Sequence, residues 1–367
     1  MKILSDINVS GKRVFVRADL DVPLREAQVT NGERLTTNAE LEVFTRLTNL
    51  KPTIDWLLEH DSNRIIIGGH IGRPKGSDPA LSTKQILPIL GKILGREIDF
   101  YPDLSTYSKP GLEQLDKPGL GRIVLLENLR FWSGEEANDP KFAQKLASVA
   151  DVYVNDAFGN CHRNHASMVA LAQLLPHAAG FHLEKEVEAL SSLLKNPKRP
   201  FVAIVGGAKI ETKVPVIENL AKVADFVLVG GKIAKELKIE NGKLKIGSDR
   251  VIVATSAVEE KDIDQRSINQ FKEVIATAKT VVWNGPMGVF EEGFDKGTRT
   301  IAQAIIGSGA YSVVGGGETT QFLAQNNLLS PPNPPTGGGG FSFVSSGGGA
   351  MLEFLAGKEL PALLALK

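Results

Sequence analysis

Short apolar runs alternate along the chain with longer amphipathic stretches. Nine such runs lie between turn-forming residues, at 13–23, 64–74, 122–131, 151–159, 200–209, 225–234, 280–288, 311–319 and 341–350. Runs this short and rich in Val and Ile are typical of strands buried on both faces, which occur in parallel sheets. Stretches such as "NDPKFAQKLASVA" and "TKVPVIENLAKVA" have helical spacing, with Asn138 or Asp139 and Thr212 as expected N-caps. The alternation predicts an α/β fold with parallel sheets covered by helices.

A predicted helix divides the chain into two halves. The first fifteen residues of "FHLEKEVEALSSLLKNPKRP" (181–200) form an amphipathic pattern, and "NPKRP" ends it. Because 367 residues exceed the usual domain of roughly 100–200, we expect two domains joined by this helix. The expected bounds are 1–175, then a connecting helix over 176–199, then 200–350. A Pro/Gly-rich stretch at 328–342 is expected to be a surface loop.

The residues that follow the predicted strands differ between the two halves. Ligands of parallel α/β sheets bind beyond the carboxyl ends of the strands. First-half strands end in polar and charged side chains, namely Arg17, Asp19, Asp21, His70, Arg73, Asn128, Arg130, Asn155, Asp156 and Arg163. Second-half strands end in glycines, namely Gly206, Gly207, Gly230, Gly231, Gly285, Gly315, Gly316, Gly317, Gly347, Gly348 and Gly349. Because glycine lets backbone N–H groups approach a ligand, we expect a small, highly charged anion in the first half and a nucleotide in the second.

One first-half loop, "VNDAFGNCHRNHAS" (154–167), allows several interpretations. It places the chain's single cysteine, Cys161, beside His162, Arg163 and His165. Zinc ligands this close together do not match the usual spacings, and adjacent residues rarely orient as a Cys–His catalytic pair. A charged surface loop is the simplest alternative. Because other first-half strands also end in Arg or His, we favour basic loops that converge on an anion with carboxylate and phosphate groups.

Two second-half motifs suggest contacts with a phosphate. In "GGAKIETK" (206–213), Lys209 and Lys213 are four residues apart, so a helix starting here puts both on one face at its positive end. A solvated helix start is the alternative. In "VVGGGETT" (313–320), Glu318 follows a glycine loop, where it is expected either to hold the magnesium of a nucleotide or to cap a helix. The chain has no GxxxxGK[ST] motif, and its first half has no GxGxxG.

Composition narrows the classes of partner and the compartment. The formal net charge is +0, from 42 basic and 42 acidic residues, which argues against general binding to nucleic acid or to a membrane surface. One cysteine allows no internal disulfide, which fits a reducing compartment. The first residues, "MKILSDINVSGKRVFV", carry charges where a signal peptide needs an apolar core, and no apolar run approaches the roughly 20 residues of a membrane span. We therefore expect a cytoplasmic protein.

Taken together, these motifs resemble the phosphoglycerate kinase family. The most specific are "GGHIGRPKG", "ENLRF", "VNDAFGNCHRNHAS", "AAGFHLEKEVEAL", "GGAKIETK", "VWNGPMGVFE" and "SSGGGAMLEFLAGKELP", in family order. The resemblance implies two Rossmann-like domains, with a tail at about 351–367 that packs back on the first. It also implies a monomeric enzyme that moves a phosphoryl group from 1,3-bisphosphoglycerate to ADP, giving 3-phosphoglycerate and MgATP.

The resemblance also implies roles for individual residues. In the first domain it assigns 3-phosphoglycerate binding to Asp19, Asp21, Arg46, His70, Arg73, Arg130 and Arg163, with Arg46 placed by "RLTNLKPTI". In the second domain it assigns nucleotide binding to Lys209, Lys213, Gly230, Asn284, Glu291, Gly315, Gly316, Gly317, Glu318 and Thr319, with Glu318 as the Mg²⁺ ligand. Arg46 and Lys209 are the expected catalytic residues, which meet the transferring group without a phosphoenzyme, and Cys161 is incidental.

Several positions depart from the family pattern. Asp21 stands where Asn is usual, Glu318 where Asp is usual, and Lys232 where a glycine is usual. Phe343 and Ser346 replace His and Thr, and the chain carries extra residues at 25–45. These departures leave open a non-catalytic binding protein that kept the fold, and the basic first half would also suit a kinase of another small carboxylate.

Overall fold

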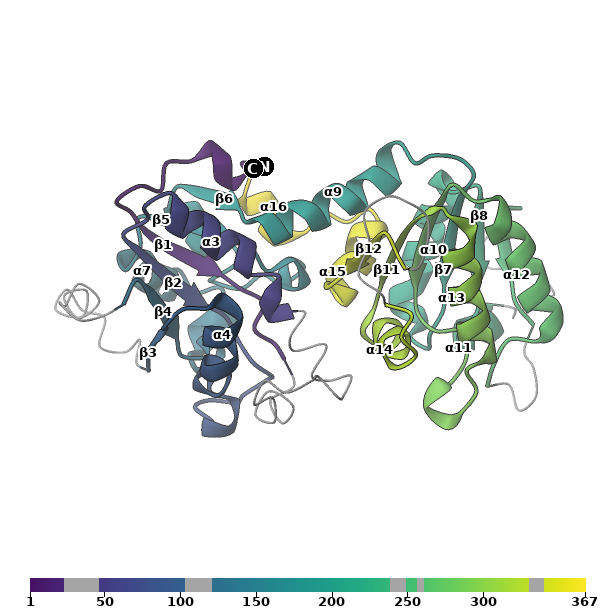
Figure 1. The fold of residues 1–367 in the computed structure, drawn as a ribbon, viewed down its shortest axis with the longest axis horizontal. Coiled ribbons are helices and arrows are strands. Elements are labelled where there is room, and N and C mark those ends of the chain that lie inside the picture. Colours follow the sequence, from purple (N-terminus) through teal and green to yellow (C-terminus); the bar gives the residue numbers. More distant parts are fainter. Residues whose placement is uncertain (23–45, 103–120, 238–248, 256–260, 330–339) are drawn as a thin grey trace. The chain divides into compact units, whose positions relative to one another are not determined.

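The computed structural model describes residues 1–22, 46–102, 121–237, 249–255, 261–329 and 340–367. They form two compact units, Met1–Glu186 with Glu359–Lys367, and Val187–Lys358 (Figure 1). The extra residues at 25–45 and most of the Pro/Gly-rich stretch lie outside the described residues. Within the described ranges, no helix combines the length and apolar character needed to cross a membrane.

A six-stranded parallel sheet forms the centre of the first unit, in the spatial order β3-β4-β2-β1-β5-β6. Its strands are β1 (Arg13–Arg17), β2 (Arg64–Gly68), β3 (Asp99–Tyr101), β4 (Ile123–Leu126), β5 (Val152–Asn155) and β6 (His177–Ala179). The central strand β1 pairs with β2 and β5, and its residues 14–16 are fully buried. Burial on both faces is what the Val-rich run predicts for a central parallel strand.

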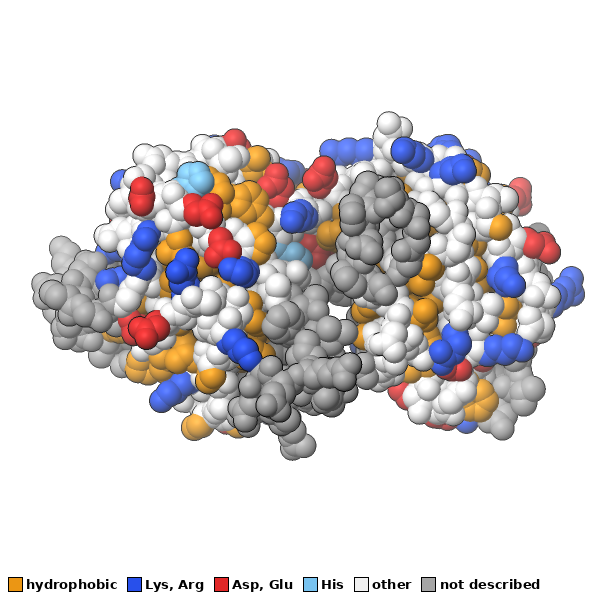
Figure 2. All heavy atoms as spheres, viewed as in Figure 1, with side chains coloured by type: hydrophobic (Ala, Val, Ile, Leu, Met, Phe, Trp, Pro, Cys, Tyr) orange, Lys and Arg blue, Asp and Glu red, His pale blue; other side chains and the backbone are white. Residues whose placement is uncertain are grey.

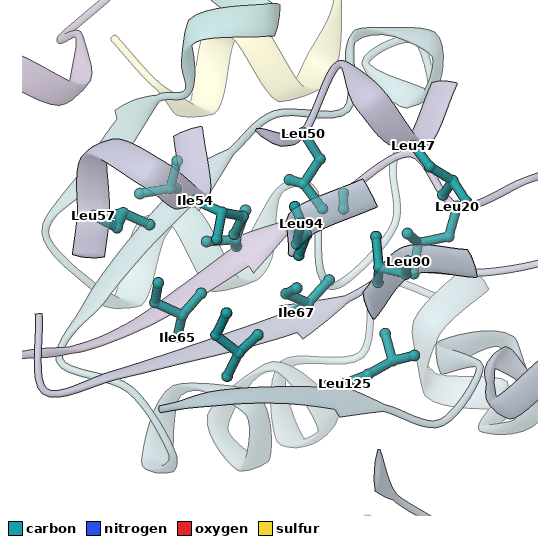
Figure 3. Packing of buried hydrophobic residues seen from close by; sticks show 14 of the residues in the cluster. Leu20, Leu47, Leu50, Ile54, Leu57, Ile65, Ile67, Leu90, Leu94 and Leu125 are labelled. Carbon is teal, nitrogen blue, oxygen red and sulfur yellow. The ribbon is translucent and has the colours of Figure 1, made fainter. Parts of the chain in front are cut away.

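Aliphatic side chains pack two helices against this sheet. In Figure 3, Ile54 and Leu57 of α3 (Lys51–Glu59) face Ile65 and Ile67 of β2. All four side chains are fully buried, and burying each contributes about 1.5–3 kcal/mol. The same core includes Leu90 and Leu94 of α4 (Leu87–Leu94), also labelled in Figure 3. This packing fixes the strands and therefore the loops that leave their carboxyl ends.

A second parallel sheet forms the centre of the other unit, in the order β12-β11-β10-β7-β8-β9. Its strands are β7 (Phe201–Val205), β8 (Phe226–Val229), β9 (Val251–Val253), β10 (Thr280–Asn284), β11 (Tyr311–Gly315) and β12 (Phe343–Ser345). This is the strand order of dinucleotide-binding domains. In such a sheet the first three strands are added toward one edge and the next three toward the other, so the strand order reverses at the middle of the sheet. The reversal lies between β7 and β10, and the two sheets confirm the predicted α/β fold.

Helices cover both sheets. In addition to α3 and α4, the first unit contains α6 (Ser133–Glu136), α7 (Pro140–Ser148), α8 (Ala170–Leu174) and α16 (Pro361–Ala365). The second contains α10 (Ile210–Val223), α11 (Gly231–Leu237), α12 (Gln265–Thr277), α13 (Lys296–Ser308), α14 (Gly317–Gln325) and α15 (Gly348–Leu355). Asp139 caps α7, as predicted, by accepting a hydrogen bond from the Lys141 N–H at 2.8 Å. The prediction for Thr212 was wrong, because α10 begins at Ile210 and Thr212 lies in its first turn.

The helix predicted over 181–195 is present as α9 (Phe181–Lys195), and the boundary between the two units falls within it, after Glu186. Near the end of the chain, α15 packs on α10 in the second unit, whereas Glu359–Lys367 belongs to the first unit, where α16 packs on α8. The assignment of a ligand to each domain stays a prediction.

Charges on the described surface are mixed in sign. On the face shown in Figure 2, Lys and Arg side chains are interspersed with Asp and Glu on each unit. Several such residues pair, including Arg13 with Asp151 at 3.0 Å, Lys51 with Asp55 at 2.7 Å and Lys261 with Glu292 at 2.8 Å. Exposed pairs of this kind contribute about 0–1 kcal/mol each. Mixed charges of this kind fit the chain's formal net charge of +0.

A substitution at Gly285, directly after β10, tests how closely the loops after β7 and β10 approach each other. The φ of Gly285 is +98°, and a Cβ there would overlap the carbonyl oxygen of Gly206. Gly285→Ala is therefore expected to lower the free energy of unfolding by about 2–4 kcal/mol in urea titrations. Gly307→Ala in α13 is the control, since no atom lies within 4 Å of a Cβ there and alanine favours the helix by about 0.5–1 kcal/mol. Equal effects of the two changes would contradict this account.

Candidate functional site

Arginine and histidine side chains gather at the carboxyl ends of the first unit's strands. Arg17 ends β1, His70 follows β2, and Arg130 lies after β4 in the turn η4 (Leu129–Phe131). Arg163 and His165 follow β5. These groups are close enough to interact electrostatically, because burial first, and then the charges of the three arginines and His165, lower the pKa of His70 well below its ordinary value. The basic loops predicted to converge therefore do so.

Several buried donors of this cluster have no hydrogen-bond partner within the described ranges. Arg130 is 4% exposed; its Nη1 donates to the Gly72 carbonyl at 2.6 Å, and its Nε lies 3.2 Å from a Glu136 carboxylate oxygen. Its Nη2, the Nε2 of His70 and the Nε of Arg163 have no hydrogen-bond partner among the described residues. Leaving a buried donor unsatisfied costs about 1–3 kcal/mol, so the cluster is built to receive acceptor oxygens from outside.

Two aspartates at the edge of the cluster contact its loops and its basic side chains. Asp21 accepts a hydrogen bond from the Gly72 N–H at 2.8 Å, and its other carboxylate oxygen lies 3.7 Å from His70 Nε2. Arg46 donates to the Asp21 carbonyl at 3.0 Å and lies 3.7 Å from the Asp19 carboxylate. Asparagine, usual at position 21, could accept the same hydrogen bond from Gly72. The departure at Asp21 therefore preserves the contact that fixes the loop after β2.

The predicted substrate residues are thus brought together, with one exception. Arg73 is exposed, and no hydrogen bond or ion pair within the described part of the chain connects it to the cluster. Its role as a ligand stays a prediction.

Cys161 lies beneath this cluster but has no nucleophilic character. Its side chain is fully buried, and its sulfur donates to the Ala157 carbonyl at 3.6 Å. Burial raises the pKa of the Cys161 thiol well above its ordinary value, whereas a nucleophile or metal ligand must be a thiolate. Among the described residues, no group of three or more His, Cys, Asp or Glu side chains could hold a metal ion. The nucleophile and zinc interpretations of this loop thus find no support among the described residues, and anion binding by Arg163 stays a prediction.

In the second unit, backbone rather than side chains lines the carboxyl ends of the strands. A Cβ on Gly206 would lie 2.6 Å from the Gly285 carbonyl oxygen, and one on Gly231 would lie 2.7 Å from the Gly207 nitrogen. Only glycine allows loops from β7, β8 and β10 to approach this closely. The helices α10 and α14 begin beside these loops, and their first N–H groups have no partners within the helix. Such helix starts favour anions.

A buried lysine lies next to these loops. Lys213 is 7% exposed, and its ammonium donates a hydrogen bond to the side-chain oxygen of Asn284 at the end of β10. Burial lowers the pKa of Lys213 to about 8; the carboxylate of Glu318 opposes this shift, and Lys209 adds to it. The structure therefore brings these four predicted residues together, with Lys209 and Glu318 exposed.

The remaining predicted nucleotide residues differ in their surroundings, and some of them pack in the interior. Thr319 is fully buried, and its hydroxyl accepts a hydrogen bond from the Gly285 N–H at 2.8 Å. A Cβ on Gly230 would overlap the sulfur of Met287, and Gly316 adopts a φ of +99°. Glu291 is exposed in the turn η7 (Phe290–Glu292), while Gly315 ends β11 and Gly317 begins α14. Contact of these residues with a nucleotide stays a prediction.

Thiol labelling tests the assignment of Cys161. The folded chain should give no iodoacetamide adduct by mass spectrometry, because the thiol is fully buried and protonated. The same protein in concentrated urea should be labelled completely. Rapid labelling of the folded protein would return Cys161 to the list of candidate nucleophiles.

Lys213 should lower the stability of the ligand-free protein near neutral pH. Its pKa of about 8 when folded lies below the unfolded value of 10.5, so its destabilising effect is fully present below pH 8 and is lost as pH rises from 8 to 10.5. Lys213→Met is expected to raise the free energy of unfolding at pH 7 by about 1–3 kcal/mol. The matched control, Lys209→Met at an exposed site, should change it by less than about 0.5 kcal/mol. Destabilisation by Lys213→Met would show that the ammonium is not strained.

Comparisons with known proteins agree with this arrangement. The family model described as phosphoglycerate kinase matches residues 4–260 and 249–358. The chain is 37% identical to the phosphoglycerate kinase of Solibacter usitatus, over 99% of this chain and 98% of that one. It is 38% identical to the cytosolic phosphoglycerate kinase of Triticum aestivum, over 99% and 97%. The solved structure of phosphoglycerate kinase from Coxiella burnetii has a TM-score of 0.76 at 32% identity and covers 99% of this chain and 98% of its own. The family model, the relatives and the solved structure thus agree that the chain belongs to the phosphoglycerate kinase family.

Proposed function

We propose that this chain catalyses the phosphoglycerate kinase reaction, which transfers a phosphoryl group from 1,3-bisphosphoglycerate to ADP. The observation that carries this proposal is that the strand ends of the two sheets present different groups, each suited to a different kind of anion. Charged side chains form the site on the first sheet, and glycine loops with helix starts form the site on the second. Directed, charge-assisted hydrogen bonds suit a small carboxylate phosphate, whereas backbone N–H groups suit the phosphates of a nucleotide.

In the first unit, we assign charge neutralisation to Arg46, Arg73, Arg130 and Arg163. The unpartnered donors of Arg130 and Arg163 support this assignment, because planar guanidinium groups match carboxylate and phosphate oxygens. Asp19 lies close enough to Arg46 to orient it, and Asp21 anchors the Gly72 loop.

In the second unit, we assign the nucleotide phosphates to the starts of α10 and α14 and to Lys213. Magnesium prefers carboxylate and phosphate oxygens, and Glu318 offers an exposed carboxylate at the start of α14. One of its oxygens lies 3.8 Å from the position of a Cβ on Gly207, so the carboxylate faces the first glycine loop. The residues present therefore fit a magnesium–nucleotide complex, in which the metal would neutralise phosphate charge.

Phosphoryl transfer needs alignment and cations around the transferring group more than covalent help. We assign this role to Arg46 and to Lys209, whose side chain is exposed and so can follow the phosphoryl group. Direct transfer agrees with the protonated, buried state of Cys161. We further propose that the enzyme acts as a cytoplasmic monomer without nucleic-acid or membrane partners.

A coupled assay tests the function. With 1,3-bisphosphoglycerate, ADP and Mg²⁺, the chain should form ATP, and omission of any component should abolish the signal. Binding of both ligands without transfer would identify a non-catalytic binding protein. Phosphorylation of another small carboxylate by ATP, with no activity on 3-phosphoglycerate, would identify a different kinase.

Two alanine variants should separate binding from transfer. Arg163→Ala removes a charge-assisted contact worth about 1.5–3 kcal/mol, so KM for 3-phosphoglycerate should rise about ten- to hundredfold. Lys209→Ala should instead lower kcat at least about a hundredfold with a smaller change in KM for nucleotide, because its ammonium acts while charge is shared between donor and acceptor. Arg96→Ala, at an exposed site after α4, is the control and should change neither constant. An unchanged kcat for Lys209→Ala would remove this residue from the mechanism.

A further inference from the structure

A chain of four fully buried polar residues runs beneath the basic cluster of the first unit. Arg17 donates from Nη2 to His70 Nδ1 at 3.0 Å and from Nε to the Ser167 hydroxyl at 2.8 Å. The Ser167 hydroxyl lies 2.6 Å from one carboxylate oxygen of Glu135, and the Ser167 N–H donates to the other at 2.9 Å. Arg17, His70, Ser167 and Glu135 each have 0% exposed surface.

The chemistry of the guanidinium group fixes every proton in this chain. Arginine only donates hydrogen bonds, so His70 Nδ1 must accept and cannot carry the proton of a neutral ring. The Ser167 hydroxyl oxygen likewise accepts from Arg17, so its own proton points to Glu135. Both oxygens of Glu135 therefore act as acceptors, as in a carboxylate. At the other end, the proton of the neutral His70 ring lies on Nε2.

The surroundings of His70 favour its neutral form. Arg17 from β1, Arg130 from η4, and Arg163 and His165 after β5 all disfavour a positive ring, and burial disfavours it most. Within the described part of the chain, the acidic group that pairs with the ring is Asp21, whose carboxylate oxygen lies 3.7 Å from Nε2. His70 Nε2 itself is buried and has no hydrogen-bond partner in the described residues. It is a donor that awaits an acceptor.

We propose that Glu135 is a positioning residue that acts through Ser167 and Arg17 to hold His70 as a neutral imidazole, with its Nε2–H ready to donate to an oxygen of phosphoglycerate. The identity of that ligand rests on the proposed function. The arginines then neutralise the charge of the ligand, and the hydrogen bond from His70 Nε2–H orients it. A buried guanidinium is stable only when its hydrogen bonds are satisfied, which explains why a carboxylate lies three hydrogen bonds away from the ring it orients.

Nitrogen-15 NMR of the ligand-free full chain, with labelled histidine rings, tests the tautomer directly. The His70 signals, assigned by their loss in His70→Gln, should show protonated Nε2 and bare Nδ1 from about pH 5.5 to about pH 8, where an ordinary histidine titrates. A proton on Nδ1, or titration near the ordinary pKa, would overturn the proposal. No substrate is present, so this result is independent of the coupled assay.

The role of Glu135 is tested by Glu135→Gln. The amide cannot accept at both positions, so the His70 signals should show Nδ1–H or begin to titrate, and KM for 3-phosphoglycerate should rise at least about fivefold with KM for nucleotide unchanged. The matched control is Asp156→Asn, another buried carboxyl of the same unit, which instead accepts from the His182 and Leu183 N–H groups of α9. It should leave the His70 signals unchanged. Loss of stability in Glu135→Gln with unaltered His70 signals would show a purely structural role.

Two further variant pairs guard against misfolding. If Glu135→Gln does not fold, Ser167→Ala should alter the His70 signals and Ser167→Thr, which keeps the hydroxyl, should alter them less; equal effects would overturn the relay. At the ring itself, the amide nitrogen of Gln occupies the place of Nε2, whereas that of Asn occupies the place of Nδ1. His70→Gln should therefore raise KM for 3-phosphoglycerate about fivefold less than His70→Asn. Equal losses in this pair would show that a neutral donor at Nε2 is not what the site requires.

Discussion

All pairings between the strands of both sheets are parallel, and this constraint decides where the chemistry lies. Parallel strands need helical crossovers, so their carboxyl ends all open at one edge of the sheet. In the first unit this edge places Arg17 next to the loops that carry His70 and Arg163, and in the second it places Gly206 against Gly285. The same architecture therefore presents side chains in one unit and backbone in the other.

Each candidate anion site contains groups that lower the stability of the folded protein when no ligand is bound. In the described part of the chain, His70 Nε2, Arg130 Nη2 and Arg163 Nε are buried without a hydrogen-bond partner, and Lys213 holds a charge that burial disfavours. In each unit, a ligand with several acceptor oxygens would relieve the unfavourable state, so binding is favoured by groups that the fold alone leaves unsatisfied. The relay from Glu135 to His70 differs from these unsatisfied groups. Its hydrogen bonds are formed within the protein, and we infer that they keep the Nε2–H of His70 in a fixed direction.

The sequence was sufficient for the regular parts of the fold, because short Val- and Ile-rich runs indicate buried strands and amphipathic helices have a clear period. All nine predicted strands are present, but β3, β6 and β9 were not predicted; each has three residues at the end of a sheet and, unlike β12, which precedes three glycines, none leads into a recognisable motif. The candidate sites followed from the residues after strands. The Glu135 relay did not, since Arg17 and Ser167 are 150 positions apart and Glu135 lies in a charged stretch typical of a surface. Only tertiary packing reveals such contacts.

The central claim is that side chains of the first unit bind phosphoglycerate and glycine loops of the second bind the nucleotide. Amide NMR titrations of the full chain test it most directly. Saturating 3-phosphoglycerate should shift the amide signals of residues 69–72 and 156–167, and saturating MgADP should shift those of residues 206–213 and 315–319. The account is contradicted if MgADP shifts the first set while leaving the second unchanged, or if both ligands shift the amides of only one unit.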